Sequence, residues 1–324
     1  MLSAAGRRVG LMRILHDSLA AMGLTGHVLA TDIVADSPAM QLASKSVIVP
    51  PYRDPQCLDF LLKLCRDEGV RLIVPTIDPE LAFYARHADA FGEAGCKINI
   101  SHPDTIAIGG DKQMTNDWLR SHAFPTVGQA PLAYALAGNV DFDFPMVVKP
   151  RFGSASVGVR IAKSRQQLQA CAGETDLLVQ SIAAGNEYTT DVFVDTTGRC
   201  RCAVPRRRLE IRGGEVSKAM TVRNASVASL ARRVAETLPG AYGVMNIQIF
   251  HDSKTGELAV IEINPRYGGG HPLAHEAGAT MTRWLLEDIL QVPSTARDDG
   301  WRDNWVMLRY DEAVYVDRQT AGIG

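Results

Sequence analysis

Several features that define other classes of protein are missing from this sequence. No apolar run approaches the ~20 residues of a membrane-spanning helix, and the N-terminus has Arg7 and Arg8 but no signal peptide's apolar core. The six cysteines are scattered without a CxxC pair, as expected for reduced thiols in a cytosolic enzyme. Charge is nearly balanced, with 34 basic and 36 acidic residues, so neither a nucleic acid nor a membrane is indicated as a partner. We therefore expect a cytoplasmic enzyme.

Two common phosphate-binding loops are also missing. No GxGxxG motif follows a strand-like segment, and GxxxxGK[ST] occurs nowhere, which argues against a dinucleotide-binding or P-loop site. The N-terminal third nevertheless alternates short apolar strands, at 28–32, 72–75 and 97–100, with helices at about 10–22 and 57–68. Such alternation predicts a parallel sheet with helices on both faces.

The most informative stretch is 260–270, which reads Val-Ile-Glu-Ile-Asn-Pro-Arg-Tyr-Gly-Gly-Gly. Strand alternation places Glu262 and Asn264 on one face, and both carry the hard oxygen donors that Mg²⁺ accepts. A hairpin turn at 252–256 follows a strand that carries Gln248, and this register can put Gln248 across from Glu262. Gln248, Glu262 and Asn264 form the predicted metal site. The alternative is an ordinary strand whose Glu262 faces water.

The segment Glu262-Ile263-Asn264-Pro265-Arg266 resembles the signature of the ATP-grasp superfamily, particularly the carbamoyl phosphate synthetase large subunit and its small single-chain relatives. In that family the Glu and Asn bind the Mg²⁺ ions that bridge the ATP phosphates. The resemblance covers essentially the whole chain and implies an α/β fold with an α+β lid. A Rossmann-like pre-ATP-grasp domain at 1–107 would precede a two-lobed ATP-grasp fold, with the lid at 108–185 and the catalytic subdomain at 186–324. A final strand pair is expected at 304–316, returning to the sheet of that subdomain. The family usually has a full first strand before the Gly-Arg-Arg turn. Here either that edge of the sheet is short or the chain begins upstream.

The resemblance also implies a set of nucleotide-binding residues. Two lysines correspond to phosphate-binding cations, and the small-residue loop at 151–159 resembles the phosphate lid, although it can also be read as an ordinary hairpin. Further residues match positions that contact adenine, and an acid matches the one that binds the ribose hydroxyls. The family more often has Glu where Gln180 stands. The predicted set is Lys112, Lys149, Ser154, Ser156, Gln180, Ser181, Ile182 and Glu187.

A second group of residues is predicted to act on the transferred phosphoryl group. Arg206 and Arg208 share one face of an expected strand, so both guanidiniums can point at the γ-phosphate, unless they form a solvated basic edge. Lys218 belongs to an expected loop of the same site at 213–218. Arg266 offers a fork for a carboxylate or phosphoryl group.

Four further residues each have two interpretations. His271 and His275, four residues apart, are expected to line the acceptor pocket rather than to bind zinc. Asp78 and Glu80 follow a strand end, where open α/β sheets bind ligands, or they cap and solvate a helix.

These residues favour an ATP-dependent carboxylate–amine ligase. ATP, with Mg²⁺ or Mn²⁺, would phosphorylate a small carboxylate, and an amine, with amino acids among the candidates, would attack the acyl phosphate. One alternative is phosphorylation of bicarbonate or carbamate, as in half of a carbamoyl phosphate synthetase, although no duplicated half or amidotransferase signature is present. Another is a nucleotide-binding module without catalysis. A homodimer is left open.

Overall fold

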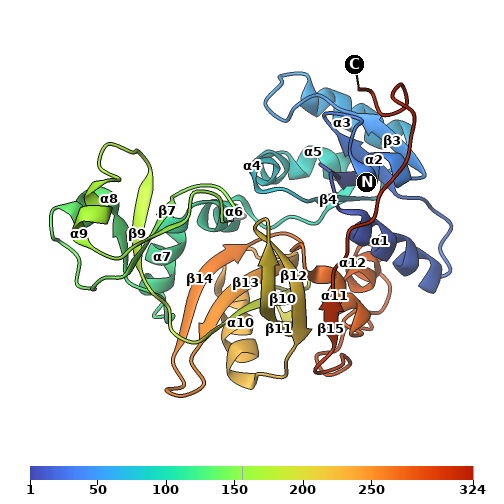
Figure 1. Cartoon of the computed structure of the whole chain (residues 1–324). Helices are drawn as coiled ribbons and strands as arrows, with labels where there is room; N and C mark the ends of the chain where they lie inside the picture. The colour runs from blue at the N-terminus through green and yellow to red at the C-terminus, as the bar shows by residue number, and fades with distance from the viewer. Residues whose placement is uncertain (155, 324) are drawn as a thin grey trace.

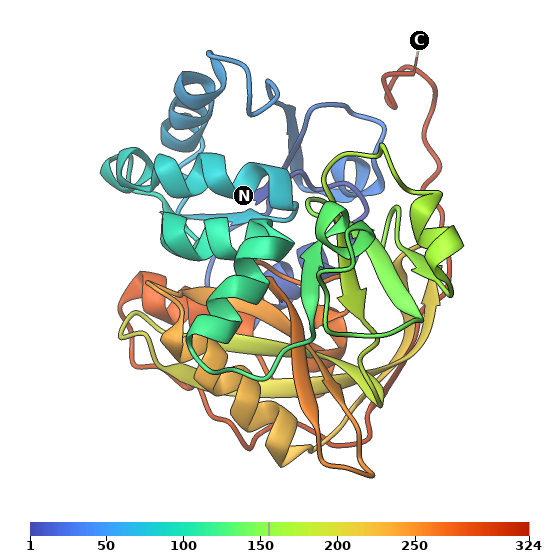
Figure 2. The same ribbon diagram turned by 90° about the vertical axis from the view of Figure 1, so that its left-hand side faces the viewer.

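The computed structural model describes residues 1–154 and 156–323, and Ala155 of the predicted phosphate lid lies outside them. Three sheets organise this part of the chain. In Figure 1 the N-terminal sheet is at the upper right, the lid sheet at the left and the largest sheet at the bottom centre. Figure 2 shows the same arrangement from the lid side. None of the helices in the described ranges combines the length and apolarity needed to span a membrane.

The N-terminal sheet has five parallel strands in the order β3-β2-β1-β4-β5, which confirms the predicted parallel sheet. The strand before the Gly-Arg-Arg turn is short, as one of the two alternatives expected, but its expected place at the sheet edge is wrong, because β1 pairs with both β2 and β4. Only Leu2 and Ser3 form it, and both are buried. The elements are β1 (Leu2–Ser3), α1 (Val9–Ala21), β2 (Leu29–Asp32), α2 (Pro38–Leu42), β3 (Lys45–Ile48), α3 (Cys57–Asp67), β4 (Leu72–Pro75), α4 (Asp78–Arg86), α5 (Ala88–Glu93) and β5 (Lys97–Ile98).

Two helices lead from this sheet to the lid, which is a four-stranded antiparallel sheet in the order β6-β9-β7-β8. Asp111 caps the second helix, since its carboxylate accepts from the backbone N–H groups of Gln113 and Met114. The lid has its own apolar cluster. The elements are α6 (Pro103–Gly110), α7 (Lys112–Ser121), β6 (Gln129–Pro131), α8 (Leu132–Leu136), β7 (Met146–Pro150), β8 (Arg160–Ala162), α9 (Arg165–Gln169) and β9 (Leu177–Ser181).

The largest sheet has six antiparallel strands in the order β14-β13-β10-β11-β12-β15. Two sequence predictions about it are wrong. The segment 213–218 is a tight turn followed by a strand, because Gly213 and Gly214 both adopt positive φ and let β11 fold back into β12. The expected final strand pair at 304–316 is the single strand β15. The elements are β10 (Asn186–Val194), β11 (Cys200–Arg212), β12 (Glu215–Thr221), α10 (Ala225–Thr237), β13 (Gly243–His251), β14 (Leu258–Asn264), α11 (His271–Glu276), α12 (Met281–Leu290) and β15 (Val306–Leu308).

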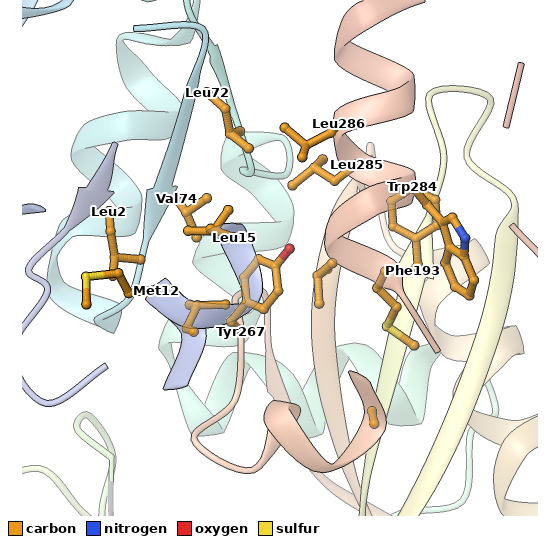
Figure 3. Packing of buried hydrophobic residues seen from close by; sticks show 14 of the residues in the cluster. Leu2, Met12, Leu15, Leu72, Val74, Phe193, Tyr267, Trp284, Leu285 and Leu286 are labelled. Carbon is orange, nitrogen blue, oxygen red and sulfur yellow. The ribbon is translucent and has the colours of Figure 1, made fainter. Parts of the chain in front are cut away.

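One apolar cluster joins the N-terminal sheet to the largest sheet. Met12 and Leu15 of α1 lie beside Tyr267, which directly follows Arg266, and α12 completes the cluster with Trp284 (Figure 3). Burial of large apolar and aromatic side chains is the main stabilising contribution in such a contact. The turn before α1 is therefore held against the glycine loop at 268–270. The domain boundaries given above stay predictions.

Candidate active site

The face of β13 and β14 brings the predicted metal ligands together. Gln248 lies directly opposite Glu262 in the strand register, and Asn246 lies opposite Asn264, so the predicted pairing is confirmed. Within the described chain, no group donates a hydrogen bond or forms an ion pair to the Glu262 carboxylate. Burial raises the pKa of that carboxyl, and the nearby Lys112 and Lys149 oppose the rise. An uncommitted carboxylate flanked by two amides fits the oxygen ligand set of Mg²⁺ or Mn²⁺, but the metal role stays a prediction.

A cavity of about 430 Å³ lies between the lid and the largest sheet, above this face. Its volume is within the usual range for a small-molecule site. Most of the predicted site residues line it. They are Lys112, Lys149, Ser154, Ser156, Gln180, Ile182, Glu187, Arg206, Arg208, Gln248, Glu262, Asn264 and Arg266.

Two predicted residues lie outside the lining of this cavity. The Ser181 hydroxyl accepts a hydrogen bond from the Gly128 backbone at 3.1 Å, which ties β9 to the segment before β6. Lys218 is half-exposed, and its ammonium pairs with Glu210 at 2.7 Å. The hairpin β11–β12 carries Lys218 away from the cavity, because this segment is a strand and not the expected loop. Neither residue is placed to contact a ligand in the cavity.

The lid contributes two lysines. Lys149 is only 8% exposed, and its ammonium donates to the side-chain oxygen of Gln180 on the neighbouring strand. Burial lowers the pKa of Lys149 to about 8, while Glu262 acts to raise it. Lys112 donates to the Gly153 backbone oxygen at 2.6 Å, at the base of the loop. Both ammoniums thus lie over the Glu262 carboxylate with mainly neutral partners, which leaves their charge available to an anion.

Two residues assigned to the nucleoside already have partners. The resemblance expects the Gln180 oxygen to accept a hydrogen bond from the adenine amino group. In this structure that oxygen already accepts a hydrogen bond from Lys149. Glu187 forms an ion pair with Arg208 at 2.5 Å, although it was expected to bind ribose hydroxyls. Their contacts to a nucleoside stay predictions, and each requires that the existing partner be shared or exchanged.

Arg206 is held by an acid that sequence reasoning missed. Asp191 of β10 is fully buried, and it accepts from Nε and Nη2 of Arg206 at 2.6 and 3.1 Å. Burial acts to raise the pKa of Asp191, but Arg206 and His271 outweigh it and lower the pKa. Asp191 directly precedes the apolar run Val192–Val194, and a charged side chain among buried apolar positions needs a partner. Asp191 could therefore have been identified as the partner of a buried cation.

Arg266 also has a partner from a distant part of the chain. Its Nε and Nη2 each donate to a different oxygen of Asp78 at 2.6 Å, and Nη2 also reaches the Asn264 side-chain oxygen at 3.2 Å. Asp78 does not cap its helix, because Ile77 is the N-cap residue and Asp78 the first helical residue. The fork expected to face the substrate is therefore turned toward the N-terminal sheet. Its role in phosphoryl transfer stays a prediction.

The two histidines do not line the cavity, contrary to the sequence expectation. His271 is fully buried, 3.8 Å from the Asp191 carboxylate and edge-on to the Tyr267 ring. His275 faces the same interior, where burial lowers its pKa to about 4. They belong to the packing beneath the glycine loop, because α11 begins directly after that loop and turns both side chains inward.

Two family models match separate parts of this chain. Residues 1–99 match the model described as "PylC-like, N-terminal domain". Residues 173–307 match the model described as "ATP-grasp in the biosynthetic pathway with Ter operon". The first covers the N-terminal parallel sheet, and the second covers the last lid strand and nearly all of the largest sheet.

Curated relatives and solved structures agree with these matches. The carbamoyl phosphate synthase large chain of Thermotoga sp. (strain RQ2) is 23% identical over 271 residues, 74% of this chain and 25% of the relative. That of Bifidobacterium adolescentis is 26% identical over 275 residues, 76% of this chain and 24% of the relative. The chain thus spans about a quarter of the length of these relatives.

Among structures, the biotin carboxylase domain of the Hydrogenobacter thermophilus 2-oxoglutarate carboxylase, in complex with MgADP, ADP and bicarbonate, is similar with a TM-score of 0.72. That similarity covers 94% of this chain and 72% of the other at 18% identity. The N5-carboxyaminoimidazole synthetase of Staphylococcus aureus has a TM-score of 0.70, with 91% and 78% covered at 18% identity.

The fold is that of an ATP-grasp protein, with a parallel sheet before the two-lobed grasp. Residues 173–307 carry an ATP-grasp family match and residues 1–99 a PylC-like N-terminal match, and the chain is homologous to the carbamoyl phosphate synthase large chain.

Proposed function

We propose that this protein is an ATP-dependent ligase that joins a small carboxylic acid to an amine through an acyl phosphate, releasing ADP and phosphate. The convergence of two lysines and one uncommitted carboxylate in a single cavity is the observation that carries this proposal. Lys112 and Lys149 lie over Glu262, and among the residues that the structure describes neither lysine has an acid at contact distance. A nucleoside triphosphate with its divalent cation supplies the charges that such a site lacks.

The residues present fit a metal–nucleotide complex. Glu262, Asn264 and Gln248 would hold Mg²⁺ or Mn²⁺ on the floor of the cavity, where the cation would neutralise phosphate charge. Lys112 and Lys149 would bind phosphate oxygens from the lid side. Transfer of a phosphoryl group to a carboxylate requires positioned cations and no side-chain nucleophile. The amine would then attack the acyl carbon, and phosphate would leave with one oxygen of the original acid.

The relatives support a substrate whose carboxylate or bicarbonate group is activated by phosphorylation. The similar structure from Hydrogenobacter thermophilus is a complex with MgADP, ADP and bicarbonate, and the curated relatives are carbamoyl phosphate synthase large chains. The relatives' names favour one alternative function, in which bicarbonate or carbamate accepts the phosphoryl group. A binding module without catalysis is disfavoured, because an uncommitted, partly buried carboxylate and a buried lysine destabilise a fold unless a ligand compensates them. The cytoplasmic location and the homodimer expected from the sequence stay predictions.

An ADP-release screen tests the proposal. The protein is incubated with MgATP, hydroxylamine and single small acids, amino acids or bicarbonate, and ADP, AMP and hydroxamate are measured. We expect ADP together with hydroxamate for at least one acid. AMP with pyrophosphate would instead indicate an acyl adenylate and refute the mechanism, and ADP with bicarbonate alone would support the alternative function.

A matched pair of variants controls the screen. Glu262→Gln removes the carboxylate from the cavity floor and should abolish ADP formation. Glu257→Gln changes an exposed carboxylate near the start of the same strand and should leave the rate unchanged. Equal rates for the two variants would remove Glu262 from the site.

A further inference from the structure

One end of the cavity is formed by a residue from the turn before α1. Arg8 lines the cavity at the end away from the lid, together with Glu215 and the glycine loop 268–270. Its side chain is 24% exposed. Arg8 reaches this position because the α1 contacts with Tyr267 hold the N-terminal turn beside the glycine loop (Figure 3).

Arg8 is the cavity arginine whose hydrogen-bond donors are least used. Within the ranges 1–154 and 156–323, its side chain makes one hydrogen bond, from Nη1 to Glu215 at the long distance of 3.5 Å. Glu215 has a closer partner in Arg309 at 2.9 Å. A guanidinium presents five donors, and in a partly buried side chain such as that of Arg8 only some of them can reach water. The remaining N–H donors of Arg8 are therefore available to bind another anion.

The other arginines of the cavity are committed to acids. Arg206 is paired with Asp191, Arg208 with Glu187 and Arg266 with Asp78. Each of these pairs has an N–O distance of 2.6 Å or less, whereas the Arg8–Glu215 distance is 3.5 Å. Around Arg8, by contrast, the Glu215 carboxylate is shared with Arg7 at 3.8 Å and Arg309 at 2.9 Å, so positive charge is in excess there.

The glycine loop leaves room beside this guanidinium. A Cβ on Gly269 would lie 3.0 Å from Nη1 of Arg8 and 3.7 Å from the Glu215 carboxyl carbon. A Cβ on Gly270 would lie 2.2 Å from Nη1 of Arg206. Side chains at these positions would press on both arginines, so the glycines keep this end of the cavity open to a ligand.

We propose that Arg8 binds a second carboxylate of the acid substrate, one that is not activated, and that the substrate is therefore a small acid with two carboxylates. This inference rests on the proposed function and names the substrate class of the same site. One carboxylate would lie beside the metal ligands and lysines, and the other would lie at Arg8. A bidentate guanidinium–carboxylate contact supplies both affinity and orientation.

Arg8 could instead be only a structural tie between the N-terminal turn and β12. A structural tie predicts that substituting Arg8 lowers stability equally with and without a diacid. A binding role predicts that substitution removes the discrimination between a diacid and its monoamide. The two roles therefore predict different values for the discrimination between a diacid and its monoamide, and this discrimination is independent of overall stability.

Thermal unfolding with matched probes tests the proposal. Wild-type protein is saturated with Mg²⁺ and a non-hydrolysable ATP analogue, and Tm is measured with succinate or succinamate, L-aspartate or L-asparagine, and L-glutamate or L-glutamine. We expect at least one diacid to raise Tm more than its monoamide, and Arg8→Gln to abolish that difference. Arg8→Lys keeps the charge and should retain part of it. Arg13→Gln, which removes an exposed arginine of α1 paired with Glu312, should retain all of it.

Binding of the ATP analogue serves as the control for folding, and it should be unchanged in every variant. For a diacid that supports ADP release, Arg8→Gln should raise KM about tenfold or more, as expected for loss of a charge-assisted contact. The proposal is overturned if no pair is discriminated by the wild type, or if Arg8→Gln discriminates as well as wild type. If diacids bind through Arg8 but no ADP forms, the substrate class stands and the proposed ligase reaction fails.

Discussion

The ion pair between Asp78 and Arg266 should couple the N-terminal sheet to the glycine loop energetically. Two hydrogen bonds of 2.6 Å join the groups, and the side chains are 28% and 10% exposed. Truncating one partner of a fully buried pair costs about 3–5 kcal/mol, whereas exposed pairs contribute about 0–1 kcal/mol. This partly buried pair lies between these limits. We expect Asp78→Asn to lower the free energy of unfolding by ~1–3 kcal/mol.

A double-mutant cycle measures the coupling between the two residues. Urea unfolding of wild type, Asp78→Asn, Arg266→Gln and the double variant should give a coupling of ~1–2 kcal/mol, within the usual range for contacting residues. The lid offers a matched control, because Arg160 and Glu174 form a bidentate pair with side chains 45% and 47% exposed. That cycle should give a clearly smaller coupling, because solvent screens an exposed pair. Equal coupling in the two cycles would refute the reasoning.

The same substitution should also affect the metal site. Arg266 reaches the Asn264 oxygen at 3.2 Å, so Asp78 fixes an arginine that contacts a predicted ligand. Asp78→Asn should raise the Mn²⁺ concentration needed for half-maximal ADP formation several-fold, since residues that orient a ligand typically change metal affinity by about 10–100-fold when substituted. An unchanged metal requirement would show that the pair is only structural.

Three further predictions concern single residues. Lys149→Met should raise the ATP dissociation constant by about tenfold to a hundredfold, because it removes a buried charge-assisted contact, and an unchanged constant in calorimetric titration would show that Lys149 is not a phosphate ligand. Glu262→Ala should abolish Mg²⁺-dependent ADP formation while leaving the unfolding midpoint near that of wild type, and near-normal turnover would disprove the metal assignment. Burial, with a smaller effect of Asp32, raises the pKa of Glu80 from 4.5 to about 7, although a hydrogen bond from Ser3 opposes the rise. The folded state therefore binds more protons than the unfolded state between these values, and stability should fall by up to ~3 kcal/mol as pH rises through this window. Glu80→Gln should flatten that profile, and an equally steep fall in the variant would assign it to other groups.

Local patterns predicted the parts of the site that lie on neighbouring strands. The alternation in 260–264 and the turn at 252–256 were sufficient to pair β13 with β14. A β-bulge between Gln248 and Ile249 then shifts the register by one residue and brings Gln248 opposite Glu262. The parallel N-terminal sheet was predictable from the alternation of apolar strands and helices. The central position of β1 was not, because two residues carry no periodicity.

Contacts between distant segments could not be read from the sequence. Asp78 and Arg266 are 188 positions apart, and Arg8 and Glu215 are 207 apart. Nothing local indicates that such residues meet, since their contact depends on how α1 and α4 pack on the largest sheet. The loop predicted around Lys218 was wrong for a related reason, because the two glycines before it were interpreted as part of a binding loop and instead form a hairpin turn.

Transfer of an oxygen atom from the acid to phosphate tests the central claim most directly. The acid that supports ADP release is prepared with ¹⁸O in its carboxylate and incubated with MgATP, the amine and the protein, and the products are analysed by mass spectrometry. An acyl phosphate intermediate requires one ¹⁸O to appear in inorganic phosphate and the other to remain in the amide. Unlabelled phosphate, or ¹⁸O in AMP, would contradict the account.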